Sequence, residues 1–420
     1  MRKIKDNDMK KYILIFLIFA LLLPGCRGAE TKGDIGYLAD AKFDTDEYLP
    51  EYDYVNTRYY PHKISQVGNS LVYTLSGEKS MYFKYFDAES GEGGVLCNKP
   101  ECTHANGSCN GYGMFFCVNY YDGSLWWMDT DRTSPGDYNR YLLRSDVSGA
   151  NRRKVLKIYR HNIQNIYIHR GYAYLVIDTN VVVGTESMTR TDLVAYALDG
   201  SGGEVTIYSN ASNLGSSLKV IFVGNRVYCC LGVYSDKALE IYCFDTKTRT
   251  GGKIATIEKN DEFSPNGVYI NRKNEIYLYG KVNKVATVWK YEDGKITEFV
   301  KFEDTEGKYT VRFMNDDVIC AMSTSRVIPT DVCWVKKYDG TTVYKLNMES
   351  DYVDNTIRKD YAEVRGGRFF ACGDENIFYI YGIVNDKDYG IYYIVMYEYD
   401  GEKIVGRLVD TDTVIYGKVY

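Results

Sequence analysis

Short runs of apolar and aromatic residues recur along the whole chain, and a tight turn leads into each of them. The turns are pairs rich in Gly, Asn and Asp, which tolerate the positive φ of hairpin turns. Seven such pairs precede apolar runs: Gly68-Asn69, Asp122-Gly123, Arg170-Gly171, Gly224-Asn225, Lys273-Asn274, Asn315-Asp316 and Glu375-Asn376. No long stretch has the 3.6-residue period of a helix. The pattern therefore predicts a series of β-hairpins.

A second signal follows each hairpin: an apolar strand that ends in Asp, with Gly close behind it. The aspartates are Asp87, Asp146, Asp199, Asp245, Asp293, Asp339 and Asp400, spaced 46 to 61 residues apart. Units of about 50 residues with four strands each are typical of β-propeller blades. We therefore predict an all-β fold, a β-propeller of seven four-stranded blades over residues 62–420. A six-bladed ring and a pair of β-sandwiches are the alternatives.

Closure of such a ring requires its two ends to meet. The run Thr413–Tyr416 is a candidate to add a strand to the first blade, and Tyr52–Tyr60 is a candidate to join the last. The sequence does not decide between them.

Composition agrees with this fold. The chain has 420 residues, 45% hydrophobic and 25% charged, so it is not a disordered polymer. Its 42 tyrosines suit blade faces, which need flat side chains between sheets and polar tips at the edges. A net charge of −5 gives no support for binding to nucleic-acid phosphates.

The N-terminus has the features of an export signal. Lys10 and Lys11 precede an apolar run over residues 12–23, which ends in Leu-Pro-Gly before Cys26. This ending resembles the lipobox of bacterial lipoproteins, and the resemblance implies that Cys26 is diacylated and anchors the protein in the membrane. We thus divide the chain into a signal peptide (1–25), a lipidated Cys with a tether (26–61) and a propeller (62–420). The alternatives are an uncleaved membrane anchor and an ordinary signal followed by a chance Cys.

Four soft metal ligands crowd into a short segment after the first predicted blade. They are Cys97, Cys102, His104 and Cys109. Three thiolates and an imidazole suit a tetrahedral structural Zn²⁺ without an open position for water. An exported protein also favours disulfides, with Cys117 as an additional partner, and free thiols are the third reading.

The remaining cysteines lie within strand runs, where a free thiol behaves as a small buried hydrophobe. They are Cys229, Cys230, Cys243, Cys320, Cys333 and Cys372.

No nucleophile, phosphate-loop or zinc-protease motif occurs in the sequence. His161 and His169 flank one predicted strand and are candidates for a channel mouth, although satisfied or solvated histidines are the simpler interpretation. Trp126 and Trp127 are adjacent, so strand alternation places them on opposite faces of one blade.

The acidic residues Asp44, Asp46 and Glu47 could bind Ca²⁺, but a solvated tether is the simpler interpretation of their sequence.

The lipobox, the blade repeat and the segment Leu96–His104 with Cys109 resemble a family of bacterial lipoproteins that carry a propeller domain of unknown function. A more distant resemblance is to TolB-type and low-density-lipoprotein-receptor-type propellers. These resemblances imply a binding module on the outer face of the membrane, with a glycan, peptide or envelope protein as its partner. The alternative is a propeller enzyme that acts on polysaccharide, a lyase or glycosidase. We expect a monomer, with no nucleic-acid partner and with no cofactor other than structural Zn.

Overall fold

The structure is a computed structural model, and 29 β-strands make up its regular elements. It describes residues 43–56, 59–60, 64–76, 81–104, 108–113, 115–134, 137–183, 185–212, 218–233, 235, 237–283, 285–302, 309–316, 318–323, 333–346, 366–373, 377–385, 389–399 and 404–415. No helix in these residues is long and apolar enough to span a membrane. The predicted signal peptide and Cys26 lie outside them.

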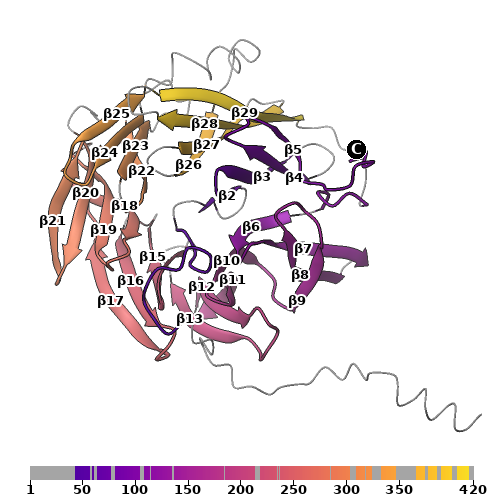
Figure 1. Ribbon diagram of the computed structural model, residues 1–420. Coiled ribbons are helices and arrows are strands. Elements are labelled where there is room, and N and C mark those ends of the chain that lie inside the picture. Colours follow the sequence, from indigo (N-terminus) through magenta and orange to yellow (C-terminus); the bar gives the residue numbers. More distant parts are fainter. Residues whose placement is uncertain are drawn as a thin grey trace, which may run out of the picture.

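The strands form antiparallel sheets arranged as the blades of a propeller around a centre (Figure 1). Blade 1 contains β1 (Tyr59–Tyr60), β2 (Ile64–Val67), β3 (Ser70–Ser76), β4 (Met81–Asp87) and β5 (Gly93–Val95). Blade 2 contains β6 (Phe115–Tyr121), β7 (Ser124–Ser134), β8 (Asp137–Asp146) and β9 (Arg153–Ile158). Blade 3 contains β10 (Ile163–His169), β11 (Tyr172–Val183), β12 (Glu186–Ala197) and β13 (Val205–Ser212).

Blades 4 to 7 repeat this order. Blade 4 contains β14 (Lys219–Val223), β15 (Arg226–Leu231), β16 (Ala238–Asp245) and β17 (Thr250–Glu258). Blade 5 contains β18 (Phe263–Ile270), β19 (Ile276–Val282), β20 (Val285–Glu292) and β21 (Lys295–Lys301). Blade 6 contains β22 (Tyr309–Met314), β23 (Val318–Ser323), β24 (Cys333–Lys337) and β25 (Thr342–Leu346). Blade 7 contains β26 (Gly366–Gly373), β27 (Ile377–Asn385), β28 (Tyr389–Tyr399) and β29 (Ile404–Ile415).

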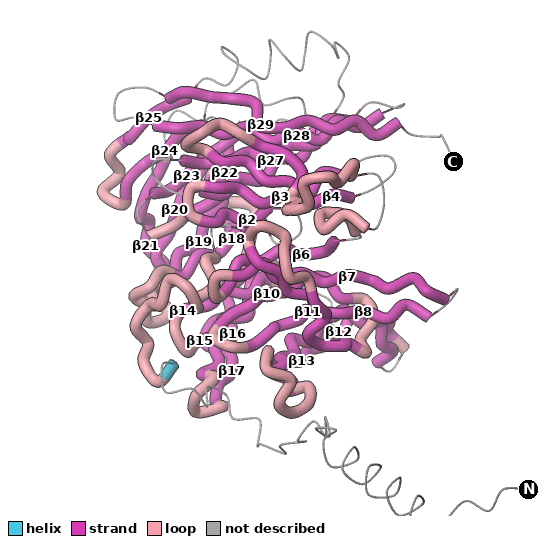
Figure 2. Tube along the Cα trace, turned by 45° about the vertical axis from the view of Figure 1, so that its right-hand side comes forward, coloured by secondary structure: helices cyan, strands magenta, loops and turns pink. Residues whose placement is uncertain are grey.

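The prediction of an all-β propeller is confirmed. The described residues form six sheets of four strands and a first sheet of five, because β1 pairs with β2. Both views show successive sheets stacked face to face around the ring (Figure 2). The predicted turn pairs that the structure describes connect β2 to β3 in blade 1 and the first two strands of each later blade, and most have positive φ, as at Gly68, Asp122 and Gly171.

Hydrophobic clusters between neighbouring blades form the core. One joins blades 1 and 2 and includes Phe83 and Trp127, whose rings meet edge to face at 5.1 Å. Similar clusters join blades 2 and 3, 3 and 4, 4 and 5, and 5 and 6, and a further cluster packs blade 7 against blade 1. In the described residues, blades 1 to 5 thus bury both faces against their neighbours.

Tyrosine connects the blades in a repeated way. The hydroxyl of Tyr121 in blade 2 accepts from the Gly171 amide in blade 3 at 2.6 Å. In the same manner Tyr228 of blade 4 donates to Asn274 of blade 5. These tyrosines bury their rings and place their hydroxyls at the hairpin turn of the next blade, which agrees with the predicted role of tyrosine in blade packing.

In the described residues, neither candidate segment adds a strand to the blade at the other end of the chain. Tyr59–Tyr60 forms β1 of blade 1, and residues 413–415 end β29 of blade 7. The parts of both candidates that form described strands therefore pair within their own blades. Side-chain packing, rather than a shared sheet, joins the first and last blades.

The N-terminal segment, residues 43–56, lies against the ring rather than standing off it (Figure 1). Its backbone carbonyls accept from the turns of two blades: Glu51 from the Asp122 amide and Tyr52 from the Arg170 amide, both at 2.9 Å. Tyr54 packs on Phe222 between blades 3 and 4. This part of the predicted tether therefore belongs to the folded unit.

Candidate metal centre

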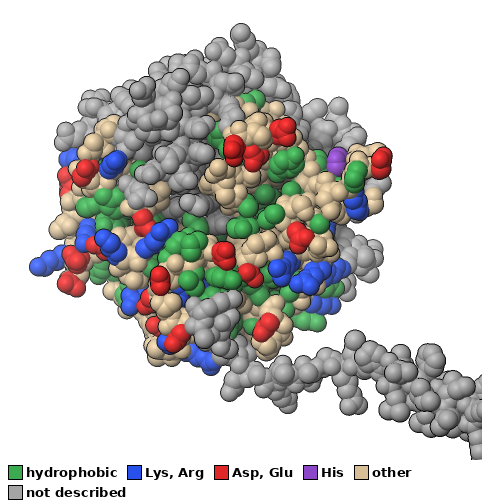
Figure 3. All heavy atoms as spheres, in the orientation of Figure 1, with side chains coloured by type: hydrophobic (Ala, Val, Ile, Leu, Met, Phe, Trp, Pro, Cys, Tyr) green, Lys and Arg blue, Asp and Glu red, His purple; other side chains and the backbone are tan. Residues whose placement is uncertain are grey.

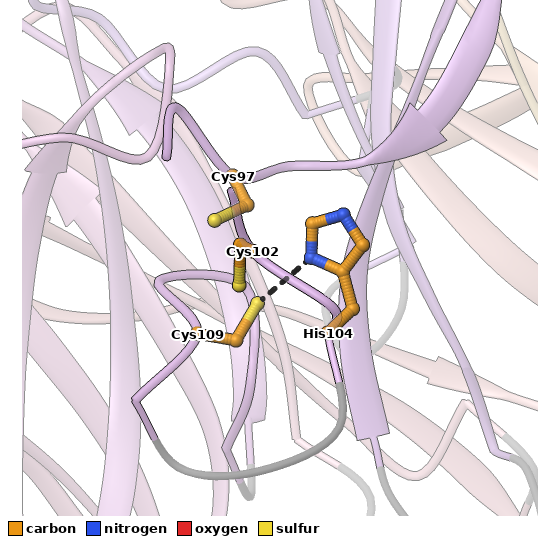
Figure 4. A group of neighbouring side chains, drawn as sticks. All are labelled: Cys97, Cys102, His104 and Cys109. Atoms are coloured by element: carbon orange, nitrogen blue, oxygen red, sulfur yellow. Dashed lines mark hydrogen bonds between the residues drawn. The ribbon is translucent and has the colours of Figure 1, made fainter. Parts of the chain in front are cut away.

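The four predicted ligands come together in the Cys loop, residues 96–113, which connects β5 of blade 1 to β6 of blade 2. Residues 105–107 of the loop are outside the described part of the chain. One ligand atom from each of Cys97, Cys102, His104 and Cys109 lies within 4.8 Å of all the others (Figure 4). His104 Nδ1 is 3.2 Å from Cys109 Sγ. Such a group could hold a metal ion.

The base of the Cys loop is closed on β4. The Phe83 amide donates to Gly111 O, and the Phe83 carbonyl accepts from the Leu96 amide, both at 2.8 Å. Tyr112 also forms a β-bridge with Tyr82. Leu96 at one end of the loop and Gly111-Tyr112 at the other thus lie along the outer edge of β4. The four ligands lie in the part of the loop between these two contacts.

Gly111 is required at this base because the surrounding backbone leaves no room. A Cβ placed on Gly111 would lie 2.7 Å from Val95 Cγ1 and 2.9 Å from Leu96 O. The sequence alone gave no reason to select this glycine, since the close approach joins segments that are far apart along the chain.

Backbone contacts hold the individual ligands in place. The Cys102 amide donates to Lys99 O at 3.1 Å, and the Tyr112 amide donates to Cys109 O at 3.2 Å. The Tyr82 hydroxyl donates to the carbonyl of His104, which has a left-handed φ of 55°. These contacts arrange the loop around the sulfur atoms before any ion is considered.

The pKa values of the thiols of Cys97 and Cys109 are shifted in opposite directions. Burial alone would raise the pKa of Cys97, but amide donors at Lys99 and Asn110 and the neighbouring thiols outweigh it and lower the pKa to about 7. Burial raises the pKa of Cys109 to about 11, and the charge on Cys97 acts in the same direction. A bound cation would favour all the thiolates together, because metal ligation deprotonates cysteine.

A basic side chain supports the cluster from blade 2. Arg152 donates through Nη1 to Tyr112 O and pairs through Nη2 with Asp129, both at 2.7 Å. Burial lowers the pKa of Arg152, while Asp129 and Cys109 raise it. The guanidinium can offset the excess negative charge that three thiolates leave around a divalent ion. The spacing of the cysteines contained no signal for this residue.

The donor set and its convergence fit zinc. Three sulfurs and one imidazole nitrogen are a known ligand set for tetrahedral structural Zn²⁺. No disulfide joins the eight cysteines whose side chains the structure describes. Cys117, the suggested additional disulfide partner, is buried in the cluster between blades 2 and 3 instead.

The other cysteines in the described strands mostly match the hydrophobic interpretation. Cys229, Cys230 and Cys320 are fully buried, and Cys243 is partly buried. Cys333 and Cys372 lie in β24 and β26, and their side chains are outside the described part of the structure.

The two candidate histidines have different environments. His161 is exposed. His169 is buried; its Nδ1 accepts from the Tyr54 amide at 2.9 Å, and its Nε2 lies 2.8 Å from Gly224 O. These two bonds make His169 a satisfied structural residue.

Arg170, beside His169, was not among the predicted site residues. It is 1% exposed and forms a bidentate pair with Asp53. It also donates to the carbonyls of Thr45 and Glu47 and to Asn225 Oδ1, so it fastens the N-terminal segment to blades 3 and 4.

The acidic residues of the N-terminal segment contact the ring. Asp46 Oδ1 accepts from the Asn225 amide at 3.1 Å, Asp44 forms an ion pair with Lys247, and the Glu47 carbonyl is held by Arg170. All three residues are exposed, as a solvated segment requires, but their contacts show that the segment is attached to the ring. They help to attach the segment.

Trp126 and Trp127 lie on opposite faces of blade 2, as alternation predicted. Both are buried, Trp126 toward blade 3 and Trp127 toward blade 1, so they serve blade packing.

Comparisons with known proteins agree on the fold. No protein-family model and no curated protein sequence matches the chain. Among solved structures, a prolyl endopeptidase is 11% identical, with a TM-score of 0.52 over 87% of this chain and 51% of that chain. Prolyl oligopeptidase B from Galerina marginata is 10% identical, with a TM-score of 0.50 over 86% of this chain and 52% of that chain. A gluconolactonase from Pseudomonas aeruginosa is 12% identical, with a TM-score of 0.44 over 83% of this chain and 98% of that chain.

The chain spans 51% and 52% of the lengths of these two peptidases. At these identities the similarity shows the β-propeller fold alone.

Proposed function

We propose that this protein is a membrane-anchored β-propeller that binds a glycan, peptide or envelope protein outside the cell membrane. A diacylated Cys26 is the anchor, and a structural zinc ion in the Cys loop stabilises the rim between blades 1 and 2. The ring is the rigid platform for the partner.

The observation that carries this proposal is the attachment of the N-terminal segment to one face of the ring. That face, the turn face, carries the turns that include Asp122, Arg170, Asn225 and Arg272. The Arg272 guanidinium lies 3.9 Å from the ring centre of Tyr48. The segment thus contacts blades 2 to 5, so a tether that ends at Phe43 reaches the ring at a defined place.

Such an attachment would limit the distance between ring and membrane. The 17 residues from Cys26 to Phe43 extend at most about 60 Å. The outer rim and the face opposite the turn face would remain available to a partner.

The buried ionisable groups also support binding rather than hydrolysis. Arg170 is paired with Asp53, and His169 has a partner at each ring nitrogen. A lyase or glycosidase needs an acid and a base that face the substrate. Among the described residues, these buried candidates instead hold the N-terminal segment.

Fractionation of cells that express the full chain tests the proposal. We expect the wild type in the detergent phase with incorporated labelled palmitate, and Cys26→Ala in the aqueous phase without label. Cross-linking of the wild type on cells should recover a stable envelope component. Unchanged partitioning of Cys26→Ala would contradict the anchor, and release of new ends from polysaccharide would support the enzyme instead.

A further inference from the structure

Blade 2 has an unusually basic outer edge. Residues 139–160 contain seven Lys or Arg residues and a single acidic residue, in a chain whose net charge is −5. These residues form the outer strands β8 and β9 and the segments next to them. Figure 3 shows Lys and Arg side chains gathered over these two strands.

Two lysines of this edge lie over aromatic rings. Lys154 Nζ is 4.1 Å from the ring centre of Tyr141, and Lys157 Nζ is 5.1 Å from that of Tyr159. Tyr141 and Lys157 are also paired across β8 and β9, so all of these groups belong to one edge of the blade. We name Tyr141, Arg153, Lys154, Lys157 and Tyr159 the basic rim.

The basic rim is open to solvent. Arg153, Lys154 and Lys157 are exposed, and Tyr159, at 76%, is the most exposed large hydrophobic residue that the structure describes. The Tyr159 ring is therefore accessible for stacking on a partner.

Two cations of the basic rim, Arg153 and Lys157, differ from their neighbours in their ion pairs. Nearby Arg152 pairs with Asp129, and Arg160 pairs with Glu204. In the described part of the chain, no acidic side chain forms an ion pair with Arg153 or Lys157. A partner with negative charge would supply the missing counter-ions.

From this surface we propose that the basic rim binds an anionic polysaccharide, and this deepens the proposed binding function and rests on it. The exposed ring of Tyr159 can stack on the apolar face of a sugar ring, and the ammonium groups beside it can pair with the carboxylate or sulfate groups of the polysaccharide. The unpaired outer edge of β9 adds backbone groups that can bond to hydroxyls. A neutral glycan would offer no anionic group to Arg153 and Lys157.

Binding of the full-length protein, in detergent micelles, to defined polymers tests this inference. Polygalacturonate supplies carboxylates, dextran sulfate supplies sulfates, and dextran is the neutral control. We expect the wild type to bind at least one anionic polymer, less tightly as salt rises, and not to bind dextran. The two anionic polymers distinguish the charged group that the rim prefers.

Matched variants locate the site. We expect Lys154→Gln/Lys157→Gln to bind about tenfold more weakly and Tyr159→Ala about threefold more weakly, although the latter keeps every charge. Lys295→Gln changes an exposed lysine of the outer strand of blade 5 and should bind like the wild type.

Each contrary result overturns the inference in a recognisable way. Equal binding of dextran would remove the role of charge, and wild-type affinity in the double-lysine variant would place the site elsewhere. Wild-type affinity in Tyr159→Ala would overturn the stacking contact. Equal binding of poly(dT) or of anionic phospholipid vesicles would show a non-selective cation surface. If no anionic polymer binds while cross-linking still recovers an envelope component, this inference fails and the proposed function stands.

Discussion

His169 is enclosed where the N-terminal segment meets blades 3 and 4. Because the Tyr54 amide donates to Nδ1, the ring proton belongs on Nε2, where it is donated to Gly224 O. Burial lowers the pKa of His169 to about 4; the nearby Asp53 opposes this shift, and Arg170 adds to it. The histidine is therefore held neutral by its surroundings.

We expect this histidine to make the protein less stable in acid. Its native pKa of about 4 lies below its ordinary value of 6.5, so between these limits the unfolded chain binds a proton that the native chain does not. The contribution is fully present above pH 6.5 and is lost as the pH falls toward 4, by about 3 kcal/mol in total. Urea unfolding at pH 7 and pH 5 measures it.

His169→Gln separates this effect from the titration of carboxylates. The variant should be less stable at pH 7, because it loses a buried hydrogen bond, but its stability should decline less between pH 7 and pH 5, by about 2 kcal/mol. His161→Gln, at an exposed position, should keep the wild-type decline. Equal declines in all three proteins would refute the assignment.

At the scale of elements, the Cys loop substitutes for part of a strand. β5 has only three residues and is the shortest outer strand of the described blades. Gly111 and Leu96 together complete the hydrogen bonds of Phe83 on β4. A metal ion between the cysteines would fasten these two pieces of edge, which no covalent bond joins.

We expect the full-length protein to carry one zinc ion, measured by elemental analysis. Cys102→Ser should lose it and unfold at a lower temperature, whereas Cys243→Ser, with a thiol in β16 away from the loop, should retain it. Gly111→Ala should also lose zinc, because its Cβ would collide with the base of the loop. Gly94→Ala is the matched control, since its Cβ would meet only Tyr85 Cε1 at an ordinary 3.7 Å. A wild type without zinc would contradict the metal site.

The elements themselves could largely be read from local sequence. Hairpins such as the one at Asp122-Gly123 can be predicted because positive φ favours particular residues. The strands can be predicted from the apolar runs beside these turns. The ligand cluster was also visible, because its members are close along the chain. The strand-like pairing of Gly111 with Phe83 was not, since it depends on two segments that meet only in three dimensions.

The whole molecule holds contacts that local patterns do not encode. The N-terminal segment lacks periodicity, so it was interpreted as a tether, yet Asp53 and Arg170 pair across 117 residues of chain. Ring closure is a similar case. The terminal runs have ordinary strand patterns, which do not specify the partner strand. Their pairing within blades 1 and 7 is seen only in the folded structure.

The seam between blades 7 and 1 is therefore held by side chains. Ile394 and Met396 of β28 pack with Leu71 and Tyr73 of β3. Asp410 of β29 accepts from the Tyr73 hydroxyl at 2.9 Å and pairs with Lys84 of β4 at 2.7 Å. No strand pairing between these blades occurs in the described residues.

We expect loss of packing at the seam to open the ring there. Met396→Ala removes a fully buried side chain and should cost about 3 kcal/mol, mostly by allowing blades 1 and 7 to separate. Native-state hydrogen exchange should then show faster exchange in both β3 and β28, with little change in β16 and β19. Ile241→Ala, at a fully buried position between blades 4 and 5, is the control of similar cost and should affect β16 and β19 instead. If Met396→Ala left exchange in β3 unchanged, the contacts between Met396 and blade 1 would not be what closes the ring.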